Sequence, residues 1–504
     1  MRRLFVALLA APLLVVPAAT PASAACARVP SDFNGDGFGD LAVGAHNRYE
    51  PIQDVPWQGA VNVAYGSAAG VGKGSLGPVT FTGHPTSVGE GFNGSMRLGE
   101  ALASGYFDGD CYADLAVSAA SGSKFLLLYG SQWGLTKDRA IGFDRTAIQP
   151  DGAYESGISY DLAAGDFNGD GFDDIAAGAP WTDGQRGAVG VLYGSDAGIS
   201  GTGSQWIDQD SPGVPGAAEP GDTFGWSVAA GDFDGDGRDE LVAGAPNEAL
   251  GGNRDAGGIV VFPGTAAGVS TTGSVWWDQD SPGVPGAVEK EDLFGYVLTT
   301  GDTGGDGRDE LIVSAPQEWI GTKAAAGAVH VFHGGASGLV PGAMFSQDDA
   351  AIPGTSESGD YFGTALALVD FNRDGKRDLA IGVRGETAGT AQATGAINVL
   401  YSTTAGPVAA GSIYLDQNSA GVPGANESQD GFGWTLSRLV NVHGGDTLVV
   451  GVPDEKVTYD WEGAVVVLPG AAVGQTRPEG YALTGANFPG GASAESNFGW
   501  GLVS

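Results

Sequence analysis

The chain has 504 residues, 88 of them glycine, and a formal net charge of −37 at pH 7. Lysine and arginine together number only 23, so few side chains could neutralise phosphates, and this excludes nucleic acid as a partner. The glycines alternate with apolar runs, a composition typical of many turns rather than of disorder. The length exceeds what one hydrophobic core usually serves, so several domains or a ring of repeats is expected.

The N-terminus has the features of an export signal. Arg2 and Arg3 precede an apolar run, and Ala22-Ser23-Ala24 matches a signal-peptidase site. The arginine pair leaves twin-arginine export open, although a general secretory signal is favoured. The apolar run is too short for a membrane helix, and no later segment is long enough. We therefore expect a signal peptide at 1–24, cleaved near Ala24, and a secreted mature domain at 25–504.

Only two cysteines occur, Cys26 and Cys111. In an oxidising compartment the simple expectation is one disulfide between them, with two free thiols as the alternative.

A repeat organises the rest of the chain. Its template is Gly-Asp-Phe-Asn-Gly-Asp-Gly-Phe-Asp-Asp-Ile-Ala-Ala-Gly-Ala-Pro at 165–180. Copies begin at positions 32, 106, 166, 232, 302, 370 and 440, and the second and seventh are the weakest. A Phe-Gly pair such as Phe224-Gly225 stands eight residues before the copies at 232, 302, 370 and 440, and a short apolar strand such as 189–194 follows the loop.

Each repeat predicts four short strands, the pattern of a propeller blade, and helix-length amphipathic segments are missing. The fold class is therefore all-β, a seven-bladed β-propeller. Before the first copy no Phe-Gly pair occurs, whereas Phe498-Gly499 near the C-terminus has no loop after it. The C-terminal strand is therefore expected to complete the first blade and remove two exposed sheet edges.

Four loops carry oxygen-bearing side chains at positions 1, 3, 5 and 9 and glycine at position 6, counting the first aspartate as position 1. Ca²⁺ takes six to eight oxygen ligands, and a tight loop presents alternate side chains inward. The glycine permits the positive φ of the reversal, and the carbonyl at position 7 adds a ligand. The predicted ligands are Asp32, Asn34, Asp36, Phe38 and Asp40; Asp166, Asn168, Asp170, Phe172 and Asp174; Asp232, Asp234, Asp236, Arg238 and Glu240; and Asp370, Asn372, Asp374, Lys376 and Asp378.

Other interpretations of these loops are weaker. Mg²⁺ prefers a small octahedral site that keeps its waters. An EF-hand would need glutamate at the twelfth position, where Val43 and Ala177 stand. A single loop could be an ordinary surface turn, but four in register favour calcium, with a stiffening role. In the fifth copy Gly304 replaces a ligand, and Asp302, Asp306 and Glu310 predict a weak or empty site. The second copy has Tyr106 at position 1 and Cys111 in place of the glycine.

The Phe-Gly strand, the acidic loop and the Gly-Ala-Pro strand end resemble the FG-GAP repeats of integrin α-chain heads and of related bacterial secreted proteins. Phe224-Gly225 with Gly244-Ala245-Pro246 is a full copy. The resemblance covers 25–504 and implies a seven-bladed propeller with calcium loops on one face and partner binding on the other. No D-x-S-x-S motif occurs, so the inserted metal-dependent adhesion domain of some integrins is not expected.

The loops after Gly-Ala-Pro are expected on the face opposite the calcium loops, and several carry aromatic residues suited to recognising a glycan or a protein. The candidate ligand-binding residues are Trp57, Trp181, Trp319, Tyr459 and Trp461. The alternative is that some of these side chains fold back to fill gaps between blades.

The residues favour a non-enzymatic extracellular binding or adhesion protein whose ligand is a glycan or a protein. No G-x-S-x-G nucleophile motif occurs. A carboxylate pair of the glycosidase kind stays open, because aspartates are numerous. The alternatives are therefore a carbohydrate-active enzyme, a lectin-like glycan binder, and a scaffold for another secreted protein.

Overall fold

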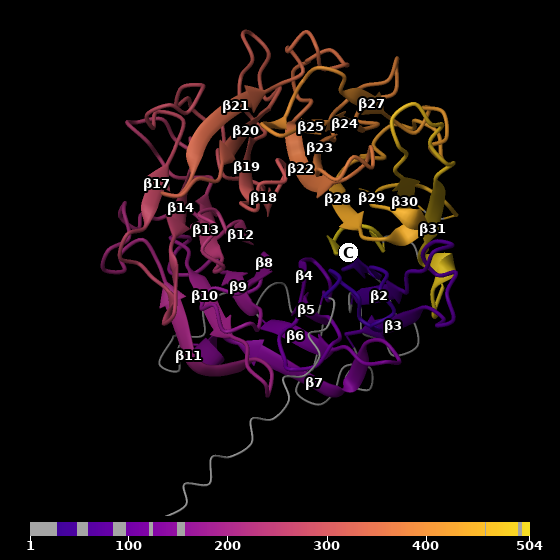
Figure 1. Ribbon diagram of the computed structural model, residues 1–504. Coiled ribbons are helices and arrows are strands. Elements are labelled where there is room, and N and C mark those ends of the chain that lie inside the picture. Colours follow the sequence, from indigo (N-terminus) through magenta and orange to yellow (C-terminus); the bar gives the residue numbers. More distant parts are fainter. Residues whose placement is uncertain are drawn as a thin grey trace, which may run out of the picture.

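The computed structural model describes residues 28–47, 59–83, 97–119, 124–148, 157–458, 460–491 and 496–503. It shows seven four-stranded antiparallel sheets arranged around a central axis (Figure 1). This confirms the predicted all-β, seven-bladed propeller. The signal peptide at 1–24 and Cys26 lie outside the described residues.

Each blade runs from an inner strand to an outer strand. Blades 1 to 4 are β32 (Leu502–Val503), β1 (Leu41–Ala45), β2 (Ala60–Ala64) and β3 (Val79–Thr82); β4 (Leu102–Gly105), β5 (Asp114–Ala119), β6 (Lys124–Tyr129) and β7 (Thr136–Asp144); β8 (Leu162–Gly165), β9 (Asp174–Gly178), β10 (Val189–Tyr193) and β11 (Ser200–Ile207); and β12 (Val228–Gly231), β13 (Glu240–Ala245), β14 (Gly258–Phe262) and β17 (Val275–Trp277).

Blades 5 to 7 are β18 (Leu298–Gly301), β19 (Glu310–Ala315), β20 (Ala328–His333) and β21 (Val340–Phe345); β22 (Phe362–Val369), β23 (Asp378–Val383), β24 (Ala396–Leu400) and β27 (Ile413–Leu415); and β28 (Thr435–Leu439), β29 (Thr447–Val452), β30 (Ala464–Pro469) and β31 (Tyr481–Thr484). Two small hairpins are β15 (Gly264–Thr265) with β16 (Gly268–Val269), and β25 (Ser402–Thr403) with β26 (Gly406–Pro407). The described helical turns are α2 (Arg145–Ile148), η1 (Val442–Gly444) and η2 (Gly485–Asn487).

The ring closes as the sequence predicts, because the C-terminal strand β32 is the inner strand of blade 1. Leu502 pairs with Val43 and Val503 with Ala42 in an antiparallel register. The Gly44 N–H also donates to the Gly501 carbonyl at 2.8 Å. Two sheet edges that would otherwise be exposed are thereby paired.

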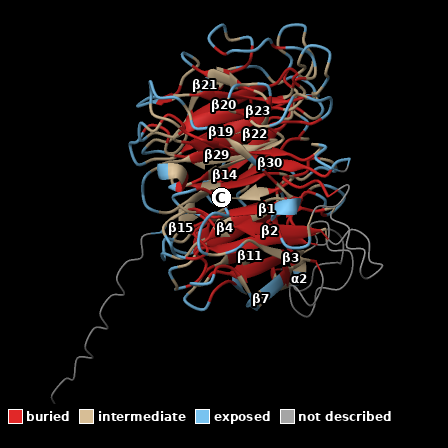
Figure 2. Cartoon of the chain, turned by 90° about the vertical axis from the view of Figure 1, so that its right-hand side faces the viewer, coloured by how far each residue is buried: buried red, intermediate tan, exposed pale blue. Residues whose placement is uncertain are grey.

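The hydrophobic core consists of layers between neighbouring blades, and the middle strands are buried almost throughout (Figure 2). One layer joins blades 1 and 2 through residues such as Val61 and Leu115. Another joins blades 7 and 1 through Val449 and Val43. Because both faces of a middle strand are covered, these strands are continuous apolar runs instead of alternating ones.

The glycines of the Phe-Gly and Gly-Ala-Pro landmarks meet across adjacent blades. A Cβ on Gly244 of blade 4 would lie 2.3 Å from the carbonyl oxygen of Gly295 in blade 5. Gly178 and Gly225 make the same approach one blade earlier, at 2.1 Å. Such distances leave no room for a side chain, so the repeated glycines are explained by close blade-to-blade contact.

A buried histidine lies between blades 4 and 5. His330 on β20 is fully buried, its Nε2 lies 3.0 Å from the Pro285 carbonyl oxygen, and its ring packs edge-on against Phe294. Burial lowers the pKa of His330 from its ordinary value of 6.5 to about 4. Asn398 occupies the equivalent place in blade 6 and donates to the Pro353 carbonyl at 2.7 Å.

Replacing His330 with Asn is expected to make the protein less sensitive to acid. Because the folded-state pKa is lowered, the unfolded chain binds more protons between pH 6.5 and 4, and stability falls as the pH falls through this window. From pH 7 to pH 4.5 this residue costs roughly 2 to 3 kcal/mol. Urea unfolding at both pH values should show a smaller loss for H330N. An equal loss in both proteins would contradict the prediction.

Candidate metal loops and ligand-binding face

The acidic loops join the inner strand of a blade to its second strand. In the loop between β8 and β9, Asp166 accepts hydrogen bonds from the N–H groups of Gly169 at 2.7 Å and Gly171 at 2.9 Å. Asn168 accepts from the Asp170 N–H at 2.8 Å, and Asp170 accepts from the Phe172 N–H at 3.0 Å. These nested turns fold the side chains of positions 1, 3 and 5 back onto the loop.

The other three predicted calcium loops have the same turns at positions 1 and 5. Asp32, Asp232 and Asp370 each accept from the N–H of the position-6 glycine at 2.8 to 3.0 Å. Those glycines have φ values of +87° to +88°, the left-handed conformation that the sequence predicts. In the fourth loop, oxygens of Asp232, Asp234 and Glu240 all lie within 4.8 Å of one another. This arrangement could hold a divalent cation with oxygen ligands.

The carboxylate at position 9 fastens the loop to the rest of its blade. Asp174 is completely buried and accepts from the Phe167 N–H at 3.0 Å and the Gly194 N–H at 2.8 Å. Asp40 and Asp378 make equivalent bonds to the residues at position 2 and to the turn after the third strand. Burial raises the pKa of Asp174 to about 8. A nearby cation would favour the ionised form of this carboxylate.

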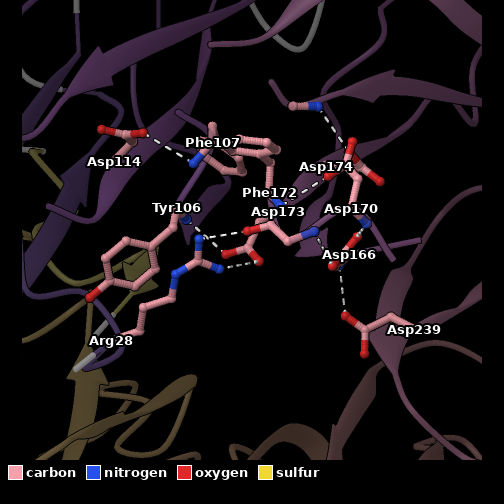
Figure 3. A network of polar contacts seen from close by, with 12 residues as sticks. Arg28, Tyr106, Phe107, Asp114, Asp166, Asp170, Phe172, Asp173, Asp174 and Asp239 are labelled. Carbon is pink, nitrogen blue, oxygen red and sulfur yellow. Dashed lines mark hydrogen bonds and ion pairs between the residues drawn. The ribbon is translucent and has the colours of Figure 1, made fainter. Parts of the chain in front are cut away.

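Position 8 connects neighbouring loops, a role that the sequence analysis missed. The Asp173 N–H donates to the Tyr106 carbonyl at 3.0 Å, and its carboxylate accepts from the Tyr106 N–H at 2.7 Å. Asp239 forms the same reciprocal pair with Asp166 (Figure 3). Asp309 forms the same pair of hydrogen bonds with Asp232 of the preceding loop, at 3.0 and 3.3 Å. The signal in the sequence is the acidic pair at positions 8 and 9.

In the second loop an arginine occupies the place expected for a cation. Asp108, Asp110 and Asp114 present oxygens within 4.8 Å of one another, although position 1 is Tyr106. Arg139 on β7 donates to Asp108 at 2.7 Å and lies 3.7 Å from Asp110, with its guanidinium over the Tyr129 ring. In the sequence this loop belongs to one of the two weakest copies of the repeat. The disulfide expected between Cys111 and Cys26 stays a prediction, because Cys26 is outside the described residues.

Replacing Arg139 with Gln is expected to create a calcium-dependent loop. The Asp108 side chain is only 4% exposed, so loss of the guanidinium leaves buried negative charge without compensation. In chelator we expect a loss of about 1 to 3 kcal/mol, which millimolar Ca²⁺ restores. The control is R254Q, which removes an exposed ion pair and costs little. Thermal unfolding of R139Q that is the same with and without calcium would contradict the prediction.

The fifth and seventh loops depart further from the pattern. In the fifth, Asp302 and Asp306 keep their turns, while Glu310 accepts from the Thr303 hydroxyl at 2.6 Å and lies 3.5 Å from His333. A histidine thus stands beside the position-9 carboxylate. The seventh loop contains the 3₁₀ turn η1, in agreement with its lost sequence pattern.

The loops between the second and third strands lie at the opposite ends of these strands. Trp181, Trp319 and Trp461 are 39%, 49% and 51% exposed, and their role in ligand binding stays a prediction. Trp181 contacts Tyr160 and Trp226 with ring centroids 5.7 and 5.6 Å apart. It therefore also covers a junction between blades. Trp57 and Tyr459 lie outside the described residues.

A pocket of about 600 Å³ opens on this face between blades 6 and 7. Arg384 contributes its guanidinium, which lies 4.8 Å from the Tyr361 ring and 4.9 Å from the Trp434 ring. Trp461 lines the pocket too, together with polar side chains such as Gln429. A guanidinium held between two rings is oriented in advance, and it suits a carboxylate or another planar anion.

Sequence reasoning found Trp461 but missed Arg384, Tyr361 and Trp434. Arg384 stands where the repeat has the proline of Gly-Ala-Pro, and this departure from the pattern was the available signal. Trp434 directly follows a Phe-Gly pair, as Trp226 does in blade 4. Its ring comes to Arg384 only through the packing of blade 6 against blade 7.

Comparison with protein families identifies the repeat. The FG-GAP repeat family matches residues 29–63, 159–192, 224–262, 294–332 and 362–400. The chain is an FG-GAP repeat protein. The five matches correspond to blades 1, 3, 4, 5 and 6. The two blades without a match hold the second and seventh loops, which depart most from the acidic pattern.

Curated relatives of this FG-GAP protein include integrin α chains. Mouse integrin alpha-8 is 30% identical over 164 residues, which cover 32% of this chain and 13% of the integrin. Integrin alpha pat-2 of Caenorhabditis briggsae is 31% identical over 245 residues, 45% of this chain and 18% of the relative. Mouse phosphatidylinositol-glycan-specific phospholipase D is 34% identical over 113 residues, 22% of this chain and 13% of that protein. The chain thus spans less than a fifth of these relatives.

Solved structures with a similar arrangement include the Dos1 propeller, with a TM-score of 0.38, 11% identity, and coverage of 78% of this chain and 69% of that one. The Vibrio cholerae biofilm matrix protein Bap1 has a TM-score of 0.32, 13% identity, and coverage of 91% and 95%. Among the described residues, no helix has the length and apolar character needed to cross a membrane.

Proposed function

We propose that this chain is a secreted, calcium-binding FG-GAP propeller that acts as a non-enzymatic extracellular binding protein. Its ligand is a glycan or a protein that offers an acidic group to the pocket between blades 6 and 7. The observation that carries the proposal is Arg384, held between the rings of Tyr361 and Trp434 at the edge of that pocket. The FG-GAP repeats support a role in binding, and mouse integrin alpha-8 is 30% identical over 164 residues.

The chemistry of the pocket suits recognition. A guanidinium donates up to five hydrogen bonds in a fixed plane and stays charged at every physiological pH. The exposed ring of Trp461 offers an apolar surface for a sugar ring or a side chain, and nearby amides such as Gln392 and Gln429 can bind hydroxyl groups. Such a site can hold and orient an acidic ligand.

Calcium in the acidic loops would serve a structural role. The four loops project from the face opposite the pocket, and position 8 joins the loops of blades 2 to 5 from blade to blade. A cation in each loop would neutralise its carboxylates and hold the inner strands in register. The pocket walls would then be kept at a fixed spacing for the ligand.

A binding screen tests the proposal. Mature protein is applied to immobilised glycans and extracellular proteins, in calcium and in chelator, beside W461A and the control W133A. Trp133 is 73% exposed and lies on the loop between β6 and β7, at the acidic-loop face. The expected result is saturable binding that W461A loses and W133A keeps. Turnover of a polysaccharide would show an enzyme instead, and activity only beside a second secreted chain would show a scaffold.

A further inference from the structure

A second acidic motif recurs in the connections between blades. Each copy has a glutamine shortly after the outer strand, and a glutamate and an aspartate before the next Phe-Gly pair. A further glutamate follows in the loop between the second and third strands. The four sets are Gln209, Glu219, Asp222 and Glu248; Gln279, Glu289, Asp292 and Glu318; Gln347, Glu357, Asp360 and Glu386; and Gln417, Glu427, Asp430 and Glu455.

The first set lies at the entry to blade 4, opposite the acidic loops. The Gln209 amide donates from Nε2 to Oε2 of Glu248 at 2.8 Å. Asp222 accepts from the Glu219 N–H at 2.5 Å. One carboxylate oxygen each from Glu219, Asp222 and Glu248 lies within 4.8 Å of the other two. With Ca–O distances of about 2.3 to 2.6 Å, one ion can contact oxygens separated by this distance.

The other three sets repeat this geometry. Their glutamine amides donate to the loop glutamates at 2.7, 2.9 and 2.6 Å. In each set the aspartate also accepts from the N–H of the glutamate three residues before it. Fourfold repetition of one polar arrangement shows that it belongs to the blade design and does not arise by chance at one surface.

Each set contains a buried polar atom without a partner. The four glutamines are only 2% to 4% exposed, and none of their Oε1 atoms has a hydrogen-bond partner among the residues that the structure describes. In the second set, Oδ1 of the fully buried Asp292 is also unpartnered. Such atoms cost about 1 to 3 kcal/mol each when nothing binds them. The side-chain amide of each glutamine is hydrogen-bonded to its glutamate. The unpartnered Oε1 atom of that amide is therefore part of the cluster.

The negative charge of these clusters is poorly compensated within the described residues, where no ion pair reaches Glu248, Glu318, Glu386 or Glu455. Burial, and then the neighbouring Asp292, raise the pKa of Glu318 to about 8. Arg186 acts weakly on Asp222, and Lys323 on Asp360. A buried carboxylate cluster of this kind needs either a proton or a bound cation.

We propose that blades 4 to 7 carry a second series of calcium sites, each formed by a glutamine, an aspartate and two glutamates on the ligand-binding face. A half-turn of the amide presents Oε1 to the ion in place of Nε2, since the two atoms are similar in size. The ligands are all oxygens, which suit Ca²⁺ and not a softer metal. The proposed ligands belong neither to the acidic loops nor to the pocket lining, although those of blades 6 and 7 adjoin the pocket.

Blade 3 provides an internal comparison. Thr182 stands where blade 4 has Glu248, and its hydroxyl donates to the Ala179 carbonyl at 2.9 Å. The same loop geometry is thus satisfied without a carboxylate. The site is confined to blades in which the glutamate and the preceding connection occur together.

Counting bound calcium tests the proposal. Native mass spectrometry of the mature chain gives the number of ions for the parent, E318Q, the quadruple variant at Glu248, Glu318, Glu386 and Glu455, and the surface control E479Q. The expected result is the loss of one ion in E318Q and of four in the quadruple variant, with no change in E479Q. D170N should lose one ion from the acidic loops and none from this second series.

An unchanged count in E318Q and in the quadruple variant would overturn the proposal and show that protons neutralise these clusters. If the quadruple variant does not fold, the single variants D292N and Q279M decide the matter. Each should weaken the affinity of one ion at least tenfold, and unaltered affinity in both would overturn the proposal. If D170N binds as many ions as the parent, the acidic loop that contains Asp170 does not bind calcium.

Discussion

Removal of calcium is expected to lower the melting temperature of the mature chain by roughly 4 °C or more. With a Kd of about 0.1 mM and millimolar extracellular Ca²⁺, each acidic loop gains on the order of 1 kcal/mol, so the four gain about 4 kcal/mol. A chain of this length unfolds with an entropy of about 1 kcal/mol/K, which gives the shift. Repulsion among carboxylates such as Asp232, Asp234 and Glu240 enlarges it.

Calorimetry in 2 mM Ca²⁺ and in excess chelator measures this shift. In calcium, D170A should melt about 1 °C below the parent, because one of the four acidic loops loses its ion. R254Q serves as the control and should shift like the parent. A melting temperature that is the same in calcium and in chelator would show that the loops are ordinary surface turns stabilised by their own hydrogen bonds.

A chain that ends at residue 495 is expected to lose at least about 5 kcal/mol of stability or to associate into larger species. The truncation removes β32, which pairs with β1, and Phe498, which is 1% exposed in the layer between blades 7 and 1. It also removes Trp500, whose ring lies 4.9 Å from that of Trp434. Loss of one buried Phe side chain costs about 3 to 5 kcal/mol alone, and the unpaired edges favour association.

Size-exclusion chromatography and urea unfolding measure both effects. Adding a peptide of residues 496–504 should restore the monomer and most of the stability, because the peptide can occupy the inner position of blade 1. A truncated chain that stays monomeric and unfolds at the urea concentration of the parent would show that three strands suffice for blade 1.

The repeat made the fold predictable. Seven acidic-loop positions and the C-terminal Phe498-Gly499 pair determine the number of blades and the closing strand, because each landmark has one place in a blade. The glycine at position 6 predicts a left-handed φ, and the structure has that conformation at Gly171 and Gly237. These features are local or repeated, so a single chain without relatives reveals them.

Features that depend on contact between blades were not predictable. Asp173 and Asp239 at position 8 serve the preceding loop, 67 and 73 residues away. Arg139 contacts Asp108 within its own blade, where the outer strand β7 passes the second loop, and a lone arginine in an edge strand carries no signal of this. Arg384 comes together with Trp434 only when blade 7 packs on blade 6. The sequence shows which residues depart from the repeat, but only the folded propeller shows which residues they contact.

Affinity of the mature chain for a ligand from the binding screen, compared with that of R384Q, tests the central claim most directly. Because the guanidinium makes charge-assisted hydrogen bonds, its loss should weaken binding at least tenfold, about 1.4 kcal/mol. R254Q, on the same face but outside the pocket, should bind like the parent. Equal affinity of R384Q and the parent for every ligand would contradict the proposed site and place recognition elsewhere on the propeller.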